Sequence, residues 1–439
     1  MEIYTQSFYN EIDEYLETIE QTFKDLPNLP IEKYKEQEKI VEEFIKENKL
    51  KIYGGVSLDK FMPDDDKIYA NRDGKIVDYD FYSPTPRKHA VDLANKLFEA
   101  GFEFVQVKEG VNLGVYKVFN YFQECADIVF IPQKVYDMVP TKNFGGLEYV
   151  APKHLKIDLL VALTNPKQGL FRWKKDYERL KKLEKYYPVE RPSSFCKTYS
   201  QPYNPTYLDE KIQEFIFKRK DFILFGDMAY FAYMRESGLK DYYEPVIKTI
   251  EIGINNPSRI FSDLKRITGN KIKIRRFHQF QKHIPTRYMV TPKGKDNNIL
   301  LIIYELNEKC IPYLDYQGDK IMTYHSLILY YNFMRYLSKL YNIKEKEHVA
   351  ECCLYDLERA KTYYFNKTGA DEFGDNVFQN FVIPCIGEEK NVVRENKIKG
   401  WSFVRKFNYI PAKREHLVTG DKTGPGIVKF VSGEFDKEV

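Results

Sequence analysis

The sequence predicts an α+β protein in which a mixed β-sheet flanked by helices is followed by a second, degenerate copy of the same unit. A strand-like run ends in Gly54-Gly55. A second run carries Asp78 and Asp80 between apolar residues. A helix–strand unit then recurs 172 residues further on, the distance from Gly54 to Gly226. Because side chains alternate faces along a strand, the second run indicates one buried face and one acidic face.

Composition limits the class of protein. A chain of 439 residues is long for one hydrophobic core and predicts two or three domains. The net charge of +4 is modest, so any nucleic-acid surface is expected to be local. Six cysteines without a CxxC spacing indicate neither a zinc site nor a disulfide framework. No apolar run reaches the roughly 18 residues of a membrane span, so we expect a soluble, cytoplasmic protein of a reducing compartment.

We expect four regions along the chain. Residues 1–37 form an N-terminal helical segment whose apolar stripe favours packing or docking. Residues 38–200 form the main domain, and residues 201–390 form the degenerate copy with its helices. Residues 391–439 interleave Lys and Arg with aromatic rings. That pattern suits single-stranded RNA, which stacks bases on rings, and it equally suits a β-meander at a subunit interface.

The first candidate site residues lie between two strands, expected at residues 50–53 and 76–81. On the second strand Asp78 and Asp80 share a face, while Val77, Tyr79 and Phe81 point into the core. Two neighbouring carboxylates repel each other unless a cation lies between them. Oxygen ligands of this kind favour Mg²⁺ or Mn²⁺. The alternative is a pair of surface acids on an edge strand.

Glycines at the end of the first strand suggest a phosphate site. Gly54 and Gly55 carry no Cβ, so the backbone can approach a phosphate closely. Backbone N–H groups there, with the hydroxyl of Ser57, can bind a triphosphate beside the metal ions. The alternative is an ordinary Gly-Gly turn.

A third carboxylate is expected on a later strand. A helix starting after Thr85 and ending at Gly101 is followed by strand-like runs at residues 102–107, 115–122 and 126–131. Asp127 is a lone acid in the last apolar run, which is costly unless it meets a cation. The alternative is a capped acid at a sheet edge.

Asp158 competes for the same role. It lies on a helix predicted by the spacing of leucines after Pro152, so we interpret it as a structural acid. Basic residues on this helix and the next one are candidates for phosphate contacts, although such charges often only face solvent. They are Lys153, Lys156, Arg172, Lys174 and Lys175.

The internal repeat predicts a site without catalytic acids. At the 172-residue offset Asp78 falls on Ile250 and Asp80 on Ile252, and Asp227 stands in place of Gly55. We therefore interpret residues 200–315 as a catalytically inactive copy that packs against the first, with the helices after Lys320 covering it. The alternative is chance similarity between two helix–strand units.

Three segments together resemble the catalytic poly(A) polymerases of poxviruses and other nucleocytoplasmic large DNA viruses, within the polymerase-beta-like nucleotidyltransferases. They are YGGVSLDKF…VDYDFYSP, CADIVFIPQKVYDMVP and YVAPKHLKIDLLVALTNP…FRWKKDYERLKKLEKYYP. The resemblance implies template-independent transfer of AMP from ATP to RNA 3′ ends, with Asp78, Asp80 and Asp127 as metal ligands. It also implies a homodimer or a processivity subunit, and a viral location in the host cytoplasm or the virion. The chain is short for the family, and its LLVAL helix is apolar where the family often carries an Arg.

The resulting hypothesis is a two-metal nucleotidyltransferase with ions about 3.5–4 Å apart between Asp78 and Asp80. Asp127 would complete the ion that activates the RNA 3′-hydroxyl, and the second ion with Gly54, Gly55 and Ser57 would hold the ATP triphosphate. One alternative is another output, such as CCA addition, uridylation or oligoadenylate synthesis. Another is a non-catalytic RNA-binding or processivity subunit, against which the three intact acids argue.

Overall fold

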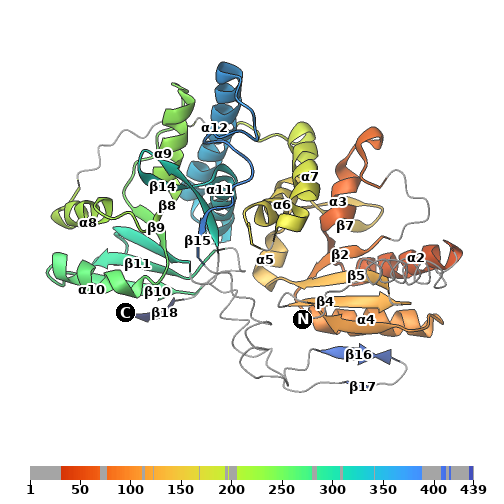
Figure 1. The fold of residues 1–439 in the computed structure, drawn as a ribbon. Coiled ribbons are helices and arrows are strands. Elements are labelled where there is room, and N and C mark those ends of the chain that lie inside the picture. Colours follow the sequence, from red (N-terminus) through yellow and green to blue (C-terminus); the bar gives the residue numbers. More distant parts are fainter. Residues whose placement is uncertain are drawn as a thin grey trace, which may run out of the picture.

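The structure is a computed structural model that contains two mixed β-sheets with helices packed on and between them (Figure 1). It describes residues 31–69, 77–110, 114–121, 123–167, 169–192, 196, 205–278, 284–306, 310–340, 342–387, 407–411, 415–416 and 435–438. The expected helix before residue 31 and the basic and aromatic residues 397–406 lie outside these ranges. The α+β class predicted from the sequence is confirmed.

The first sheet has the strand order β17-β16-β3-β4-β5-β2-β1-β7-β6. β2 runs parallel to β5 and antiparallel to β1, so the sheet is mixed. Its elements, with their helices, are α2 (Ile31–Glu47), β1 (Lys51–Ile52), α3 (Gly54–Phe61), η1 (Asp64–Asp66), β2 (Tyr79–Ser83), α4 (Pro86–Glu99), β3 (Gln106–Glu109), β4 (Val115–Asn120), β5 (Gln123–Phe130), α5 (Gln133–Met138), β6 (Thr141–Phe144), β7 (Leu147–Val150), α6 (Pro152–Leu163), η2 (Leu170–Arg172), α7 (Trp173–Tyr186), β16 (Asn408–Ile410) and β17 (Glu415–His416).

The second sheet has the order β15-β13-β14-β8-β9-β12-β11-β10-β18. As in the first sheet, a short strand pairs antiparallel with a strand that is parallel to its other neighbour. The elements are α8 (Tyr207–Phe217), β8 (Ile223–Leu224), α9 (Gly226–Ser237), β9 (Ile250–Ile254), α10 (Ser258–Ile267), β10 (Ile272–Phe277), β11 (Arg287–Pro292), β12 (Leu301–Glu305), β13 (Ile311–Tyr316), β14 (Asp319–Met322), α11 (Tyr324–Leu340), α12 (Lys344–Thr368), β15 (Cys385–Ile386) and β18 (Phe435–Glu438).

The start of the first sheet differs from the sequence prediction. The strand before the glycines is only two residues long, and the chain enters helix α3 at Gly54 where a loop was expected. Thr85 is the residue before α4, as predicted, but its side chain makes no capping hydrogen bond. Instead the Thr85 N–H donates to Ser83 Oγ at 2.9 Å. Pro86 occupies the first turn and Gly101 follows the helix with φ +85°, both as the pattern indicates.

The duplication extends further than the sequence predicted. We call residues 31–186 the first copy and residues 207–368 the second copy. Helix α6 starts at Pro152 and α11 at Tyr324, again 172 residues apart, and each follows a hairpin whose second strand pairs parallel with the short strand. The helices after Lys320 are therefore the counterparts of α6 and α7, and the copy does not end near residue 315.

One hydrophobic core joins the two copies. Leu155 and Leu160 of α6 and Leu180 and Leu183 of α7 belong to the same buried cluster as the strands of the second sheet. The inner faces of β2, β5 and α4 form a separate cluster. In Figure 1 helices α6 and α7 lie between the two sheets. The helices that end the first copy are thus packed on the second copy.

Two disulfides correct the expectation drawn from cysteine spacing. Cys196 pairs with Cys352 and Cys310 with Cys385, at sequence separations of 156 and 75 residues. Such pairs are set by tertiary contacts and leave no local spacing signal. Among the described residues Cys125 and Cys353 are buried free thiols. No helix of the described chain is long and apolar enough to cross a membrane.

Candidate active site

Two predicted acids lie side by side on neighbouring parallel strands. Asp80 of β2 and Asp127 of β5 are Cα partners in the register of the sheet. Adjacent strands are about 4.8 Å apart and partners point to the same face, so the two carboxylates share one face. Asp78 precedes β2 and is exposed, while Val77 and Tyr79 are buried. The alternation inferred from the sequence therefore gathers all three acids.

Gly54 lies against Asp80, and Gly55 lies against Tyr69 and Arg179. Gly54 has φ +69°, and a Cβ there would lie 2.1 Å from Oδ2 of Asp80. A Cβ on Gly55 would lie 2.2 Å from the Tyr69 hydroxyl and 3.2 Å from Nη2 of Arg179. The backbone N–H of Tyr53 donates to the Asp80 carbonyl at 2.9 Å. These contacts hold the N-terminus of α3 beside the acidic face of the sheet, where N–H groups favour anions.

Ser57 does not join this group. Its side chain is fully buried and its hydroxyl donates to the Val150 carbonyl at 2.9 Å. This contact fixes α3 to the end of β7. The geometry gives Ser57 a structural contact in place of the phosphate contact suggested by the sequence.

The pKa values of two of the acids are raised. Burial and the negative charge of Asp78 together raise the pKa of Asp80 to about 7. Burial, together with Glu124, raises the pKa of Asp127 to about 8. The Oδ1 atom of Asp127 is buried without a hydrogen-bond partner. Carboxylate oxygens without a hydrogen-bond partner are suitable ligands for Mg²⁺ or Mn²⁺.

Lys117 is a site residue that the sequence analysis missed. It is the partner of Asp127 across β4 and β5, and its Nζ donates to Asp127 Oδ2 at 2.9 Å. It also donates to Glu124, so one cation orients two acids. The alternation of β4, with Tyr116 and Val118 buried, was the sequence signal that could have placed Lys117 on the open face.

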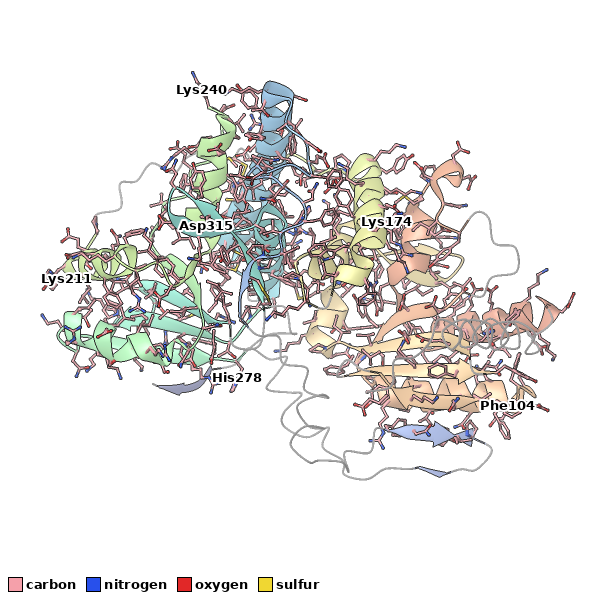
Figure 2. All side chains as sticks on the ribbon, viewed as in Figure 1. Phe104, Lys174, Lys211, Lys240, His278 and Asp315 are labelled. Atoms are coloured by element: carbon pink, nitrogen blue, oxygen red, sulfur yellow. A yellow bond between two sulfur atoms is a disulfide. The ribbon has the colours of Figure 1, made fainter. Side chains whose placement is uncertain are left out.

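A row of cations on η2 and α7 faces the acids. Arg172, Lys175 and Arg179 recur at three- and four-residue spacing, which places them on one face of a helix. Burial lowers the pKa of Lys175, and the positive charges of Arg179 and Arg172 lower it further. Arg172 also pairs with Asp176, with 3.0 Å between Nε and Oδ2. The repulsion that the other cations exert on Lys175, beside the acids, favours an anionic ligand. Lys174 lies on the same helix (Figure 2).

The remaining candidates have other roles. Lys153 pairs with Glu190 at 2.7 Å, and Lys156 donates to the Tyr187 carbonyl at 2.6 Å. Asp158 lies on α6 as predicted, is half-buried, and accepts a hydrogen bond from the Tyr82 hydroxyl at 2.9 Å. Burial raises the pKa of Asp158 to about 7. These residues support the helices around the site.

Comparison with known proteins finds a family to which part of the chain is similar. Residues 39–169 match the family model described as poly(A) polymerase catalytic subunit. That segment contains all three acids and both glycines. The matched segment is therefore similar to the catalytic subunits of poly(A) polymerases.

Relatives of this family come from large DNA viruses. The chain is 27% identical over 404 residues to a protein of Acanthamoeba polyphaga mimivirus assigned by inference as the poly(A) polymerase catalytic subunit, covering 82% of this chain and 68% of the relative. The corresponding protein of African swine fever virus (isolate Tick/Malawi/Lil 20-1/1983) is 30% identical over 175 residues, covering 37% of this chain and 36% of its own length. The fold is shared with the crystal structure of the Megavirus polyadenylate synthase, with a TM-score of 0.78, 22% identity and coverage of 94% and 87% of the two chains.

The second copy corrects one part of the repeat predicted from the sequence. The N–H of Phe225 donates to the Glu251 carbonyl, as that of Tyr53 does to the Asp80 carbonyl, both at 2.9 Å. Asp80 therefore corresponds to Glu251, 171 residues away, and not to Ile252. β2 and β9 also share one order of buried and half-buried residues. One residue fewer between the helix and the strand explains why a gapless comparison chose the wrong face.

The second site still lacks the metal ligands. The partner of Glu251 on β12 is Ile302, where the first copy has Asp127. Glu251 is half-buried and accepts hydrogen bonds from Tyr304 at 2.8 Å and Tyr330 at 2.9 Å. Tyrosine hydroxyls thus occupy the carboxylate oxygens that a cation would need. The inference of an inactive copy stands on this arrangement, with Glu251 as a remaining single acid.

Proposed function

We propose that the chain is a polynucleotide adenylyltransferase that transfers AMP from ATP to the 3′ end of RNA. The observation that carries this proposal is the meeting of Asp80 and Asp127 on adjacent strands beside the N-terminus of α3. The match of residues 39–169 to the poly(A) polymerase catalytic subunit model supports the reaction class. Single-stranded RNA and ATP are the substrates that follow from it.

Asp78, Asp80 and Asp127 are the residues that would hold Mg²⁺ or Mn²⁺. A divalent cation bound there supplies charge neutralisation for the triphosphate and lowers the pKa of the attacking hydroxyl. The 3′-oxygen of the RNA forms a bond to the α-phosphorus, the bond to the β-phosphate oxygen breaks, and pyrophosphate leaves. Asp127, whose Oδ1 has no hydrogen-bond partner among the described residues, would accept the hydroxyl proton. Lys117 keeps the other oxygen of Asp127 oriented.

The glycines and the cations of α7 hold the triphosphate in this proposal. Gly54 and Gly55 leave the start of α3 open to phosphate oxygens. Arg179 lies next to Gly55, and Arg172 and Lys175 continue the positive row towards the acids. Fixed cations of this kind stabilise the charge that develops on the leaving pyrophosphate. Binding and orientation by these residues supply most of the expected rate enhancement.

Primer extension tests the proposal. Purified full-length chain is incubated with labelled single-stranded RNA, each nucleoside triphosphate separately, and Mg²⁺ or Mn²⁺. Ladders with ATP and not with CTP, GTP or UTP are expected. Extension with CTP or UTP in preference to ATP would keep the site and change the substrate. No extension by folded protein under any of these conditions would show that the chain is a binding subunit.

A further inference from the structure

The second copy contains a cavity at the place where the first copy has its acids. The cavity has a volume of about 440 Å³ and lies between the second sheet and α11. Met289 and Ile302 in its wall are Cα partners, as Lys117 and Asp127 are in the first copy. Thr164 of α6 also lines it, so one end lies at the junction of the two copies. Figure 2 shows His278, which follows β10, at this end of the second sheet.

The walls are mainly aromatic and aliphatic. Phe225 stacks on Tyr304 with ring centroids 4.9 Å apart, and Phe277 and Phe333 line other parts of the cavity. Ligand sites in proteins commonly combine such walls with a few polar groups and volumes of about 300–1,000 Å³. The cavity volume of about 440 Å³ is therefore in the range of sites that hold one small molecule of the size of a nucleotide.

Two cations line the cavity, and the charge of one of them, Lys346, already acts on Asp227 and Glu251. Nη1 of Arg287 is shielded from solvent and has no hydrogen-bond partner, while its guanidinium lies over the Phe277 ring at 5.3 Å. Lys346, at the start of α12, also lines the cavity. The nearby acids are already engaged, Asp227 with Tyr331 and Glu251 with Tyr304 and Tyr330. A shielded guanidinium without a partner is costly, which indicates an external anion.

We propose that this cavity binds a free mononucleotide, with its phosphate at Arg287 and Lys346 and its base between the aromatic walls. The guanidinium of Arg287 lies over the Phe277 ring, and protein surfaces that bind nucleic-acid bases also combine cations with aromatic rings. The volume holds one nucleotide and not a strand, so the ligand is AMP-sized and not RNA. Without counterparts of Asp78 and Asp127 the cavity binds without catalysis. This proposal does not depend on the activity of the first copy.

AMP binding to the full-length chain in EDTA tests the proposal by titration calorimetry. One AMP per chain is expected, with affinity at least about 10-fold lower in Arg287→Gln. Arg266→Gln, a change of an exposed α10 arginine, is the matched control and keeps wild-type affinity. Ile302→Phe, which fills the cavity, lowers the affinity as well. Unfolding temperatures equal to that of the wild type would show that the variants are folded and that their lower affinity is not caused by misfolding.

Three outcomes would overturn the proposal: no binding of AMP, equal affinity in wild type and Arg287→Gln, or displacement of AMP by oligo(A) at equal nucleotide concentration. Loss of AMP binding in Arg179→Gln but not in Arg287→Gln would place the ligand in the first copy and would also overturn it. The proposed function fails separately, through primer extension. A chain that binds AMP as expected but extends no RNA would retain this inference and lose that function.

Discussion

The two copies share one backbone plan and differ in what neutralises their acids. In the first copy Asp80 and Asp127 face each other with an unpartnered oxygen. In the second copy Glu251 is satisfied by two tyrosine hydroxyls, and its neighbour on β12 is Ile302. The fold therefore tolerates loss of the acids, because protein donors replace the cation. A buried carboxylate alone does not indicate a catalytic site. A buried carboxylate with an oxygen that lacks a hydrogen-bond partner does.

The largest expected effect comes from substituting the corresponding acids of the two copies, Asp80 and Glu251. Asp80→Asn removes a metal ligand, so primer extension should fall by about 10³-fold or more while the fold is kept. The matched change Glu251→Gln should leave the extension rate within about threefold, because that acid has only structural partners. It should lower thermal stability, since one tyrosine loses an acceptor. Equal losses of activity in the two variants would mean that both copies are catalytic.

The next effect compares the cations of the two copies. Arg179→Gln should raise the KM for ATP by about 10- to 100-fold, because a charged contact to phosphate is lost. Its counterpart at the 172-residue offset is Glu351, so the second copy has a reversed charge there. Glu351→Gln should leave the KM for ATP unchanged. Steady-state primer extension at varied ATP measures both, and an unchanged KM in Arg179→Gln would remove the triphosphate assignment.

Substitution of the glycine at the start of α3 or of α9 is expected to have a smaller effect. Both Gly54→Ala and Gly226→Ala should destabilise by about 1–2 kcal/mol, because both positions have positive φ. Only Gly54→Ala should also lose activity, since its Cβ would overlap Asp80 Oδ2. Urea unfolding and primer extension on the same preparations test this pair. Full activity in Gly54→Ala would show that the close approach is not needed.

The smallest effect concerns pH and the helices between the copies. Burial lowers the pKa of His154 in α6 to about 4, against about 6.5 in the unfolded chain. Below pH 6.5 the unfolded state therefore binds a proton that the folded state does not, and stability falls until about pH 4. His154→Phe should reduce the loss between pH 7 and pH 5 by about 2 kcal/mol. Urea unfolding at the two pH values measures it, and an unchanged difference would mean that His154 is protonated in the fold.

The sequence was sufficient for features that depend on local alternation. Asp78, Asp80 and Asp127 could be placed because apolar neighbours fix the face of each strand. The sequence comparison failed where one residue of loop length decides which side chains of a strand share the face of the acids. It therefore matched Asp80 to Ile252 and not to Glu251. Ser57 looked like a phosphate ligand because hydroxyl and glycine are close in sequence, but helix α3 turns that side chain towards Val150.

Long-range contacts account for the rest. Arg179 meets Gly55 only after α7 folds back over α3, and no local pattern sets that distance. Arg172 and Lys175 were candidates in the sequence, but their arrangement as one repelling row required the structure. The two disulfides belong to the same category.

The common core of α6, α7 and the second sheet has a consequence for how this chain can evolve. Two of the cations that face the acids, Lys175 and Arg179, stand on α7, whose Leu180 and Leu183 belong to the same buried cluster as the strands of the second sheet. Substitutions in the second copy that remove its own acids are therefore free of catalytic consequence, whereas deletions that remove its fold are not. Selection for activity at the first site is enough to preserve the fold of the second copy, even after the second copy has lost its own catalytic residues.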